Sequence, residues 1–317
     1  MSVDGGEPII ETRDLRKAYG SVVALDGLTL ALPRTSVGLL GANGAGKSTL
    51  IKLLLGLEEP TAGTRAVMGL DVATHPYRVR ERVGYMPESD CLPLDVTAAD
   101  FVGHMAEMSG LPSKSARLRA AETLYQCGVD EERYRLIREF STGMKQRVKL
   151  AQAIVHDPSL VFLDEPTNGM DPVGREEMLR LITRIHRDLG ITVLLSSHLL
   201  EDVEQVCDYV VMLDQGRMVI HGPVVELLAG SGDTLVQIDG DQAAFAARLE
   251  AGGLAVERRG VELVVRPTGD ATFDVIRDAA ADLDVLLRGL RVEARSLEDI
   301  YVRQLSAEQD IADVRAD

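Results

Sequence analysis

The stretch Gly41-Ala-Asn-Gly-Ala-Gly-Lys-Ser48 decides the fold of this chain. It follows an apolar run over residues 36–40 that is typical of a strand, and it precedes a run over residues 48–55 with the spacing of a helix. The glycines let the backbone curl so that consecutive N–H groups point at phosphate oxygens, and the helix adds the positive end of its dipole. Lys47 brings a point charge to the β- and γ-phosphates, and Ser48 brings a hydroxyl that can ligate Mg²⁺. The stretch therefore predicts a phosphate-binding loop between a strand and a helix.

A second signal is Leu160-Val-Phe-Leu-Asp-Glu165. Its four apolar residues predict a buried strand, and its two carboxylates stand at the C-terminal end, where ligands of open α/β sheets bind. We expect Asp164 to hold Mg²⁺, directly or through water, and Glu165 to act as general base on the attacking water. Taken alone, the stretch is also compatible with a strand that simply ends in an acidic turn. Together with the glycine-rich loop it forms a Walker A and Walker B pair, which predicts a nucleotide-hydrolysing site.

The composition is that of an ordinary globular protein, and it limits the possible partners. The chain has 317 residues, 45% of them hydrophobic and 26% charged, and its length suggests two domains. The net charge of −16 argues against nucleic acid as the main ligand, because phosphate backbones need a surface rich in Lys and Arg. No apolar run approaches the roughly 18 to 20 residues that cross a bilayer, and the acidic N-terminus does not resemble a signal peptide. We therefore expect any membrane role to be peripheral and to act through a partner.

The order of strand and helix patterns predicts an α/β chain in two parts. From residue 8 to about 222, short β-branched runs are mixed with helical stretches, but between about 93 and 158 only helical spacing is found. Small, flexible residues around 227–233 mark a boundary, and a β-α-β-β-α-β pattern follows, which predicts a small ferredoxin-like α+β sandwich. We place the first domain at residues 8–230, with a helical subdomain at about 90–158, and an accessory domain at residues 231–317.

The element boundaries follow from the same periodicities. The expected strands cover residues 22–30, 36–40, 160–163, 192–195, 209–213, 235–238, 255–258, 262–266 and 286–293. The expected helices cover residues 98–108, 113–126, 144–156, 242–251, 273–283 and 297–305.

Three further motifs narrow the class of nucleotide-binding protein. Phe140-Ser-Thr-Gly-Met-Lys-Gln-Arg147 lies between the two Walker motifs, and Gly169-Met-Asp171 and Ser196-Ser-His198 follow them. The order and spacing of these pieces over residues 8 to about 222 resemble the ATP-binding cassette (ABC) family. The resemblance implies a P-loop NTPase fold, with a RecA-like mixed-sheet core and a helical subdomain.

The resemblance also implies a role for each matching residue. Tyr19 would stack on adenine, although a plain turn tyrosine remains an alternative reading. The signature residues Ser141, Thr142 and Gly143 would contact the γ-phosphate bound by a second subunit, Asp171 would cross the dimer interface, and His198 would reach the γ-phosphate as the switch histidine. A satisfied core histidine is the alternative reading for His198. The phosphates would be bound by Gly41, Ala42, Asn43, Gly44, Ala45, Gly46, Lys47, Ser48 and Thr49.

The chain departs from the family pattern at two places. The family usually has glutamine where this chain has Glu88; a carboxylate still ligates Mg²⁺, but when ionised it cannot donate a hydrogen bond. The metal ligands expected here are thus Ser48, Glu88 and Asp164. The signature has Thr142 and Met144 where Gly and Gln are commonest. Both signature variants, the C-terminal extension and the ending over residues 296–303 are similar to those of ABC-2 type exporters.

These observations lead us to expect a homodimeric ATPase that binds ATP and Mg²⁺ and powers a separate integral membrane permease. The permease would dock near residues 88–108, and the chain would lie peripherally on the cytoplasmic face of the cell membrane, without nucleic acid. Two alternatives stay open: a soluble ABC ATPase that acts on ribosomes or nucleic acid, and a nucleotide sensor that does not transport. The accessory domain would serve dimerisation or regulation, or be an inert appendage.

Overall fold

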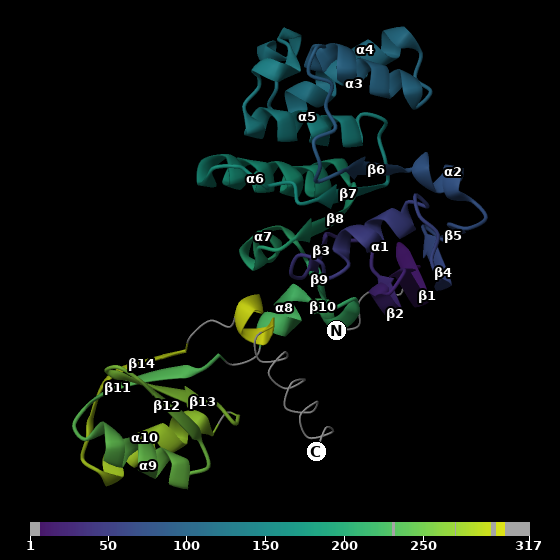
Figure 1. Ribbon diagram of the computed structural model, residues 1–317. Helices are drawn as coiled ribbons and strands as arrows, with labels where there is room; N and C mark the ends of the chain where they lie inside the picture. The colour runs from purple at the N-terminus through teal and green to yellow at the C-terminus, as the bar shows by residue number, and fades with distance from the viewer. Residues whose placement is uncertain (1–6, 230–231, 270, 293–295, 302–317) are drawn as a thin grey trace. The chain divides into compact units, whose positions relative to one another are not determined.

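The computed structural model describes residues 7–229, 232–269, 271–292 and 296–301 (Figure 1). The chain separates into two compact units, one ending at Val224 and the other beginning at Val225. Within the described residues, no helix is both long enough and apolar enough to span a bilayer.

A six-stranded sheet forms the centre of the first unit. Neighbouring strands run parallel from the second to the sixth position, and the first strand pairs antiparallel at one edge. Its order is β10 (Arg217–Pro223), β9 (Tyr209–Asp214), β3 (Val37–Leu40), β8 (Thr192–Ser197), β7 (Leu160–Asp164) and β6 (Val83–Met86). Every residue of β3, β7 and β8 is buried, as expected for parallel strands covered on both faces. These strands lie where the sequence predicts them.

A second, antiparallel sheet of four strands lies in the same unit. Its order is β2 (Val22–Leu32), β1 (Ile10–Tyr19), β4 (Ala62–Val67) and β5 (Leu70–Asp71). Helix α1 (Lys47–Leu54) buries Leu50, Ile51 and Leu54 in a core that also holds side chains of both sheets. The glycine-rich loop that precedes α1 is therefore anchored on a rigid element. Only β2 of this sheet was predicted, and it runs two residues further than expected.

Three helices gather at one end of the first unit, beyond β6 (Figure 1). They are α3 (Ala98–Met108), α4 (Ser113–Gln126) and α5 (Thr142–Ile154), and two 3₁₀ turns at Glu131–Tyr134 and Ile137–Glu139 lie between α4 and α5. Helices α3 and α4 have the predicted bounds, whereas α5 begins two residues earlier than predicted because the Ser141 hydroxyl caps it by accepting from Met144 N. The remaining helices of the first unit are α2 (Pro76–Arg80), α6 (Pro172–Leu189) and α7 (Leu200–Val206), and α8 (Val224–Leu228) begins at the boundary between the two units.

The second unit contains a four-stranded antiparallel sheet in the order β12 (Ala255–Arg259), β13 (Glu262–Arg266), β11 (Thr234–Asp239) and β14 (Leu286–Val292). Helices α9 (Gln242–Ala251) and α10 (Thr272–Asp282) connect the strands in the order β-α-β-β-α-β. Phe245, Leu249 and Ile276 of these helices share a core with Val236 and Leu263 of the sheet. The helix expected over residues 297–305 is helical over 297–301, and its remainder lies outside the described residues.

Candidate functional site

The glycine-rich loop joins the end of β3 to the start of α1 and lines a cavity of about 270 Å³. Gly46 has φ +105°, and a Cβ there would lie 2.5 Å from the carbonyl oxygen of Ala24. Only glycine fits this turn, because other residues are strained at that φ and the carbonyl leaves no room. The cavity is lined by Ala24, Ala42, Asn43, Gly44, Gly46, Lys47, Ser48, Thr49, Glu88 and Glu165.

Lys47 is buried and lines this cavity. Its Nζ donates to the carbonyl oxygen of Gly41 at 2.6 Å and lies 3.5 Å from Oε1 of Glu165. The ammonium therefore connects the first residue of the glycine-rich loop with the end of β7. An ammonium group beside the backbone amides of a glycine-rich loop is suited to bind a polyphosphate.

Asp164 and Ser48 bring two oxygen ligands together. The Ser48 hydroxyl donates to Oδ1 of Asp164 at 3.3 Å, and the Ser196 hydroxyl donates to the same oxygen at 2.5 Å. Among the described residues, no cluster of three or more His, Cys, Asp or Glu side chains is arranged to hold a metal alone. A carboxylate and a hydroxyl are oxygen ligands of the kind that Mg²⁺ uses in nucleotide sites.

Glu165 has a left-handed backbone conformation, and its two carboxylate oxygens have different surroundings. Its φ is +49°, a left-handed conformation that non-glycine residues adopt mainly where the surroundings enforce it. Its backbone N–H donates to the carbonyl oxygen of Ser196 at 3.1 Å, and its Oε2 lies 2.8 Å from Nδ1 of His198. Its Oε1 is buried, is paired with the Lys47 ammonium at 3.5 Å, and accepts no hydrogen bond from the described part of the chain. A buried acceptor beside the phosphate-loop cavity is suited to receive a water.

Glu88 follows β6 and lines the same cavity as Lys47 and Glu165. The side-chain Nδ2 of Asn168 donates to its Oε1 at 3.2 Å. One oxygen of the Glu88 carboxylate is thus held by the Asn168 amide. Glu88, which departs from the family pattern, lines the phosphate-loop cavity.

Tyr19 ends β1 and is 45% exposed. Its hydroxyl donates to Oε2 of Glu58, and burial together with this bond raises the pKa of Tyr19. The Nζ of Lys17 lies 4.8 Å from the ring centroid, so a cation covers one face of the ring. Tyr19 is not among the residues that line the phosphate-loop cavity.

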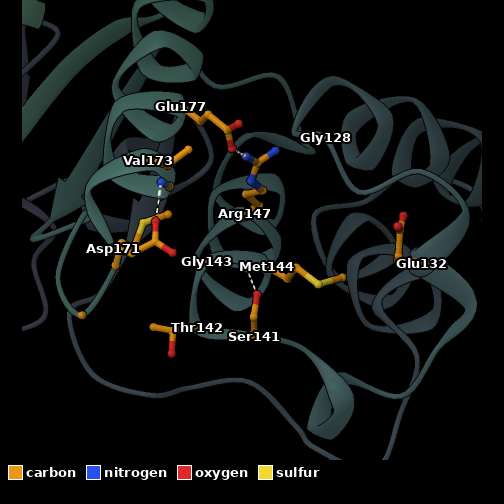
Figure 2. A pocket seen from close by; sticks show the side chains of 13 residues that line it. Gly128, Glu132, Ser141, Thr142, Gly143, Met144, Arg147, Asp171, Val173 and Glu177 are labelled. Atoms are coloured by element: carbon orange, nitrogen blue, oxygen red, sulfur yellow. Dashed lines mark hydrogen bonds and ion pairs between the residues drawn. The ribbon is translucent and has the colours of Figure 1, made fainter.

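The signature residues line a second cavity of about 540 Å³, which shares no residue with the first. Ser141 caps α5, and Asp171 caps α6 by accepting from Gly174 N at 2.7 Å. Figure 2 shows Asp171 and Val173 on one side of this cavity and Ser141 and Met144 on the other. The lining residues are Gly128, Glu132, Ser141, Thr142, Gly143, Met144, Arg147, Gly169, Met170, Asp171, Val173, Gly174 and Glu177. The phosphate loop and the signature residues therefore line two separate cavities within one chain.

Comparison with known proteins assigns the family. The family model "ABC transporter" matches residues 25–168. The bacitracin transport ATP-binding protein BcrA of Bacillus licheniformis is 38% identical over 216 residues, which cover 68% of this chain and 70% of that protein. The daunorubicin resistance ATP-binding protein DrrA3 of Streptomyces coeruleorubidus is 32% identical over 309 residues, which cover 95% and 94%. The chain belongs to the ATP-binding subunits of ABC transporters.

The fold agrees with this assignment. The structure of cbiO1 from Clostridium perfringens, part of an ABC transporter complex, superimposes with a TM-score of 0.64 at 27% identity, covering 71% of this chain and 92% of that one. The predicted P-loop cassette fold, the ATPase class and the function as the ATP-binding subunit of a transporter are confirmed.

Sequence reasoning missed several side chains that contact the predicted residues. Ser196 bonds to Asp164, Asn168 bonds to Glu88, and the amide Nε2 of Gln146 donates to the carbonyl oxygen of Asn168 at 3.1 Å. Ser196 lies two residues before His198, so its place at the end of a strand was a usable signal. Asn168 and Gln146 carry no such signal, because their partners are distant in sequence.

Proposed function

We propose that two copies of this ABC ATPase close head-to-tail over two molecules of Mg·ATP, hydrolyse them and reopen, and that this cycle drives export through a separate integral membrane permease. The observation that carries the proposal is that the phosphate loop and the signature residues line two cavities without a common residue. Ser141 and Gly143 lie at a helix N-terminus, which favours an anion, yet they are outside the cavity of Lys47. A nucleotide shared between two chains uses both cavities.

Binding of ATP relies on residues 41–49 and Tyr19. The loop amides and Lys47 would hold the phosphates, and the uncovered face of Tyr19 would receive adenine, since Lys17 covers the other face. Ser48, Asp164 and Glu88 would hold Mg²⁺, whose positive charge would neutralise the phosphates.

Hydrolysis relies on Glu165 and His198. Glu165 would take a proton from the water that attacks the γ-phosphate, and the products are ADP and inorganic phosphate. The carboxylate is well suited to this step, because Oε2 contacts His198 whereas Oε1, which lies 3.5 Å from the Lys47 ammonium, accepts no hydrogen bond from the described residues. His198 would keep the carboxylate oriented and reach the γ-phosphate through its other nitrogen.

The membrane partner would dock in a groove beside α2, β6 and α3. This groove has a volume of about 820 Å³, and Tyr77 and Met108 in its wall are 76% and 72% exposed. Exposed aromatic and methionine side chains are typical of interaction surfaces. The occupant we propose is a cytoplasmic segment of the permease, because the chain is a transporter subunit and none of its described helices can span a bilayer. The chain would thus lie on the cytoplasmic face of the cell membrane.

The domain assignment is also part of this proposal. Residues 8–230 would form the ATP-binding domain, with its helical subdomain at about 90–158, and residues 231–317 would form a ferredoxin-like accessory domain. The antiparallel sheet and the separate core of the second unit support this division.

Mixing two inactive variants tests the shared site. Lys47→Ala disables the phosphate loop, and Ser141→Arg fills the signature cavity. If each site is built from two chains, a mixed dimer has one intact site, so an equal mixture should regain about a quarter of the unaltered ATPase activity. Light scattering provides a second measurement: Glu165→Gln should remain a dimer with Mg·ATP, whereas Lys47→Ala should stay monomeric. A mixture without activity, together with a monomeric Glu165→Gln, would overturn the proposal.

A further inference from the structure

Lys149 is a buried charge that no motif explains. It lies on α5, is 2% exposed, and its Nζ donates to the backbone carbonyl oxygen of Glu88 at 3.0 Å. An ammonium group is costly to bury unless hydrogen bonds and opposite charges compensate it. We therefore expect this buried ammonium to have a role in the loop that carries Glu88.

The surroundings of Lys149 are acidic. Burial lowers the pKa of Lys149, and nearby groups oppose this effect: Cys91, Asp90, Glu88 and Asp164. Two of these, Glu88 and Asp164, are the carboxylates expected at the Mg²⁺ site. The geometric link to that site is the 3.0 Å hydrogen bond from the ammonium to the backbone of Glu88.

A second connection links the same helix to the Glu88 carboxylate. Gln146 lies one turn before Lys149 and donates through Nε2 to the carbonyl oxygen of Asn168 at 3.1 Å. Asn168 in turn donates through Nδ2 to Oε1 of Glu88 at 3.2 Å. Helix α5 therefore holds residue 88 twice, by its backbone through Lys149 and by its side chain through Asn168.

We propose that Lys149 is a positioning residue that adapts this ATPase to a carboxylate at position 88. Its ammonium fixes the backbone of Glu88 and offsets the negative charge that Glu88 adds beside Asp164 and Glu165. The inference rests on the proposed function only in that Glu88 faces the bound nucleotide.

The physical consequence is an energetic coupling between residues 88 and 149. Without the charge of Lys149, Lys47 is the one cationic side chain in the described lining of the cavity that opposes the carboxylates of Glu88 and Glu165 beside the phosphates. An amide at position 88 removes one of these negative charges, so the loss of Lys149 then matters less. Coupling between residues in one network typically changes an equilibrium between about twofold and a hundredfold.

A double-mutant cycle tests this coupling. It consists of Lys149→Met, Glu88→Gln and the double variant, with Lys149→Arg as the charge-retaining variant. Lys114→Met, which removes an exposed lysine of α4, is the matched control. The first readout is the affinity for a fluorescent ATP analogue in EDTA, where neither Mg²⁺ nor hydrolysis contributes. The second readout is kcat at saturating Mg·ATP.

We expect Lys149→Met to weaken metal-free ATP binding about tenfold with Glu88, and by less than about twofold with Glu88→Gln. The kcat should fall in the same pattern. Lys149→Arg should retain most of the ATP affinity and most of kcat, and Lys114→Met should change neither quantity. Equal losses in both backgrounds, or a chain that fails to fold in both, would overturn the inference. Folding of Lys149→Met only with Glu88→Gln would support it. Failure of the unaltered protein to hydrolyse ATP would count against the proposed function, while the metal-free binding cycle would still decide this inference.

Discussion

The Nδ1 of His198 lies 2.8 Å from Oε2 of Glu165, so the two residues expected to act in hydrolysis are in direct contact. Because a carboxylate oxygen only accepts, Nδ1 carries the proton and Nε2 is the nitrogen left for another partner. His198 follows β8 and Glu165 follows β7, and these parallel strands are hydrogen-bonded neighbours. The contact is therefore set by the sheet itself, with Glu165 held at φ +49°.

Replacing His198 tests this contact. His198→Ala frees the Glu165 carboxylate to rotate, and we expect kcat to fall about a hundredfold, as for the loss of a group in acid–base catalysis. The affinity for ATP should change by less than about threefold, because Lys47 and the loop amides remain. His75→Ala, which removes an exposed histidine outside the site, should leave kcat unchanged. A His198→Ala enzyme with unaltered kcat would contradict the role.

The departure at position 88 predicts a change in metal dependence. Glu88→Gln exchanges a carboxylate for an amide, which binds Mg²⁺ more weakly. The amide oxygen can still accept from Asn168, so the side chain should keep its place and kcat should stay within about threefold. The Mg²⁺ concentration for half-maximal hydrolysis should rise about tenfold. Complete loss of ATP binding would mean that the loop after β6 has another role.

Tyr19 predicts a contribution to binding by its ring. Tyr19→Ala removes a stacking surface worth about 1–3 kcal/mol, so ATP affinity should fall about tenfold. Tyr19→Phe keeps the ring and should bind ATP nearly as well, although it loses the bond to Glu58. Tyr134→Ala, at an exposed tyrosine elsewhere, is the control. Equal ATP affinity of Tyr19→Ala and the unaltered protein would contradict stacking of adenine on Tyr19.

The packing of α5 on β6 predicts a stability effect. A Cβ at Gly84 of β6 would lie 1.9 Å from the carbonyl oxygen of Ala153 on α5. Gly84→Ala must displace the signature helix and should lower the free energy of unfolding by about 1–3 kcal/mol. In Gly103→Ala of α3 the nearest atom is 4.0 Å away, so that variant should be neutral or slightly stabilising. Thermal unfolding that fails to separate the two variants would contradict this packing.

Sequence reasoning succeeded where the signal is local. The buried strands β7 and β8 and the loop before α1 are continuous stretches whose composition predicts their structure. Strand β1 was missed because its residues are largely polar and its pairing with β2 shifts register at three places, so it lacks a clean alternation. Helix α6 was also missed, although its buried residues recur with helical spacing.

In the candidate site, too, local features could be predicted from the sequence and long-range contacts could not. Residues within a motif were predicted, because short-range geometry places them on one turn. The bond from Lys149 to Glu88 joins residues 61 positions apart, and that from Asn168 to Glu88 joins residues 80 apart. Such contacts depend on the packing of α5 and the neighbouring loops against the sheet. No local sequence pattern predicts that packing.

The central claim, that this ATPase drives a separate membrane protein, is tested most directly by affinity capture. Tagged Glu165→Gln protein is recovered from solubilised native membranes with Mg·ATP, before and after maleimide modification of Cys91. This thiol lies in the proposed docking groove and is exposed, whereas Cys127 and Cys207 are buried. We predict that one polytopic membrane protein co-purifies stoichiometrically and is lost after the modification. Recovery of ribosomes or nucleic acid without a membrane protein would contradict the account.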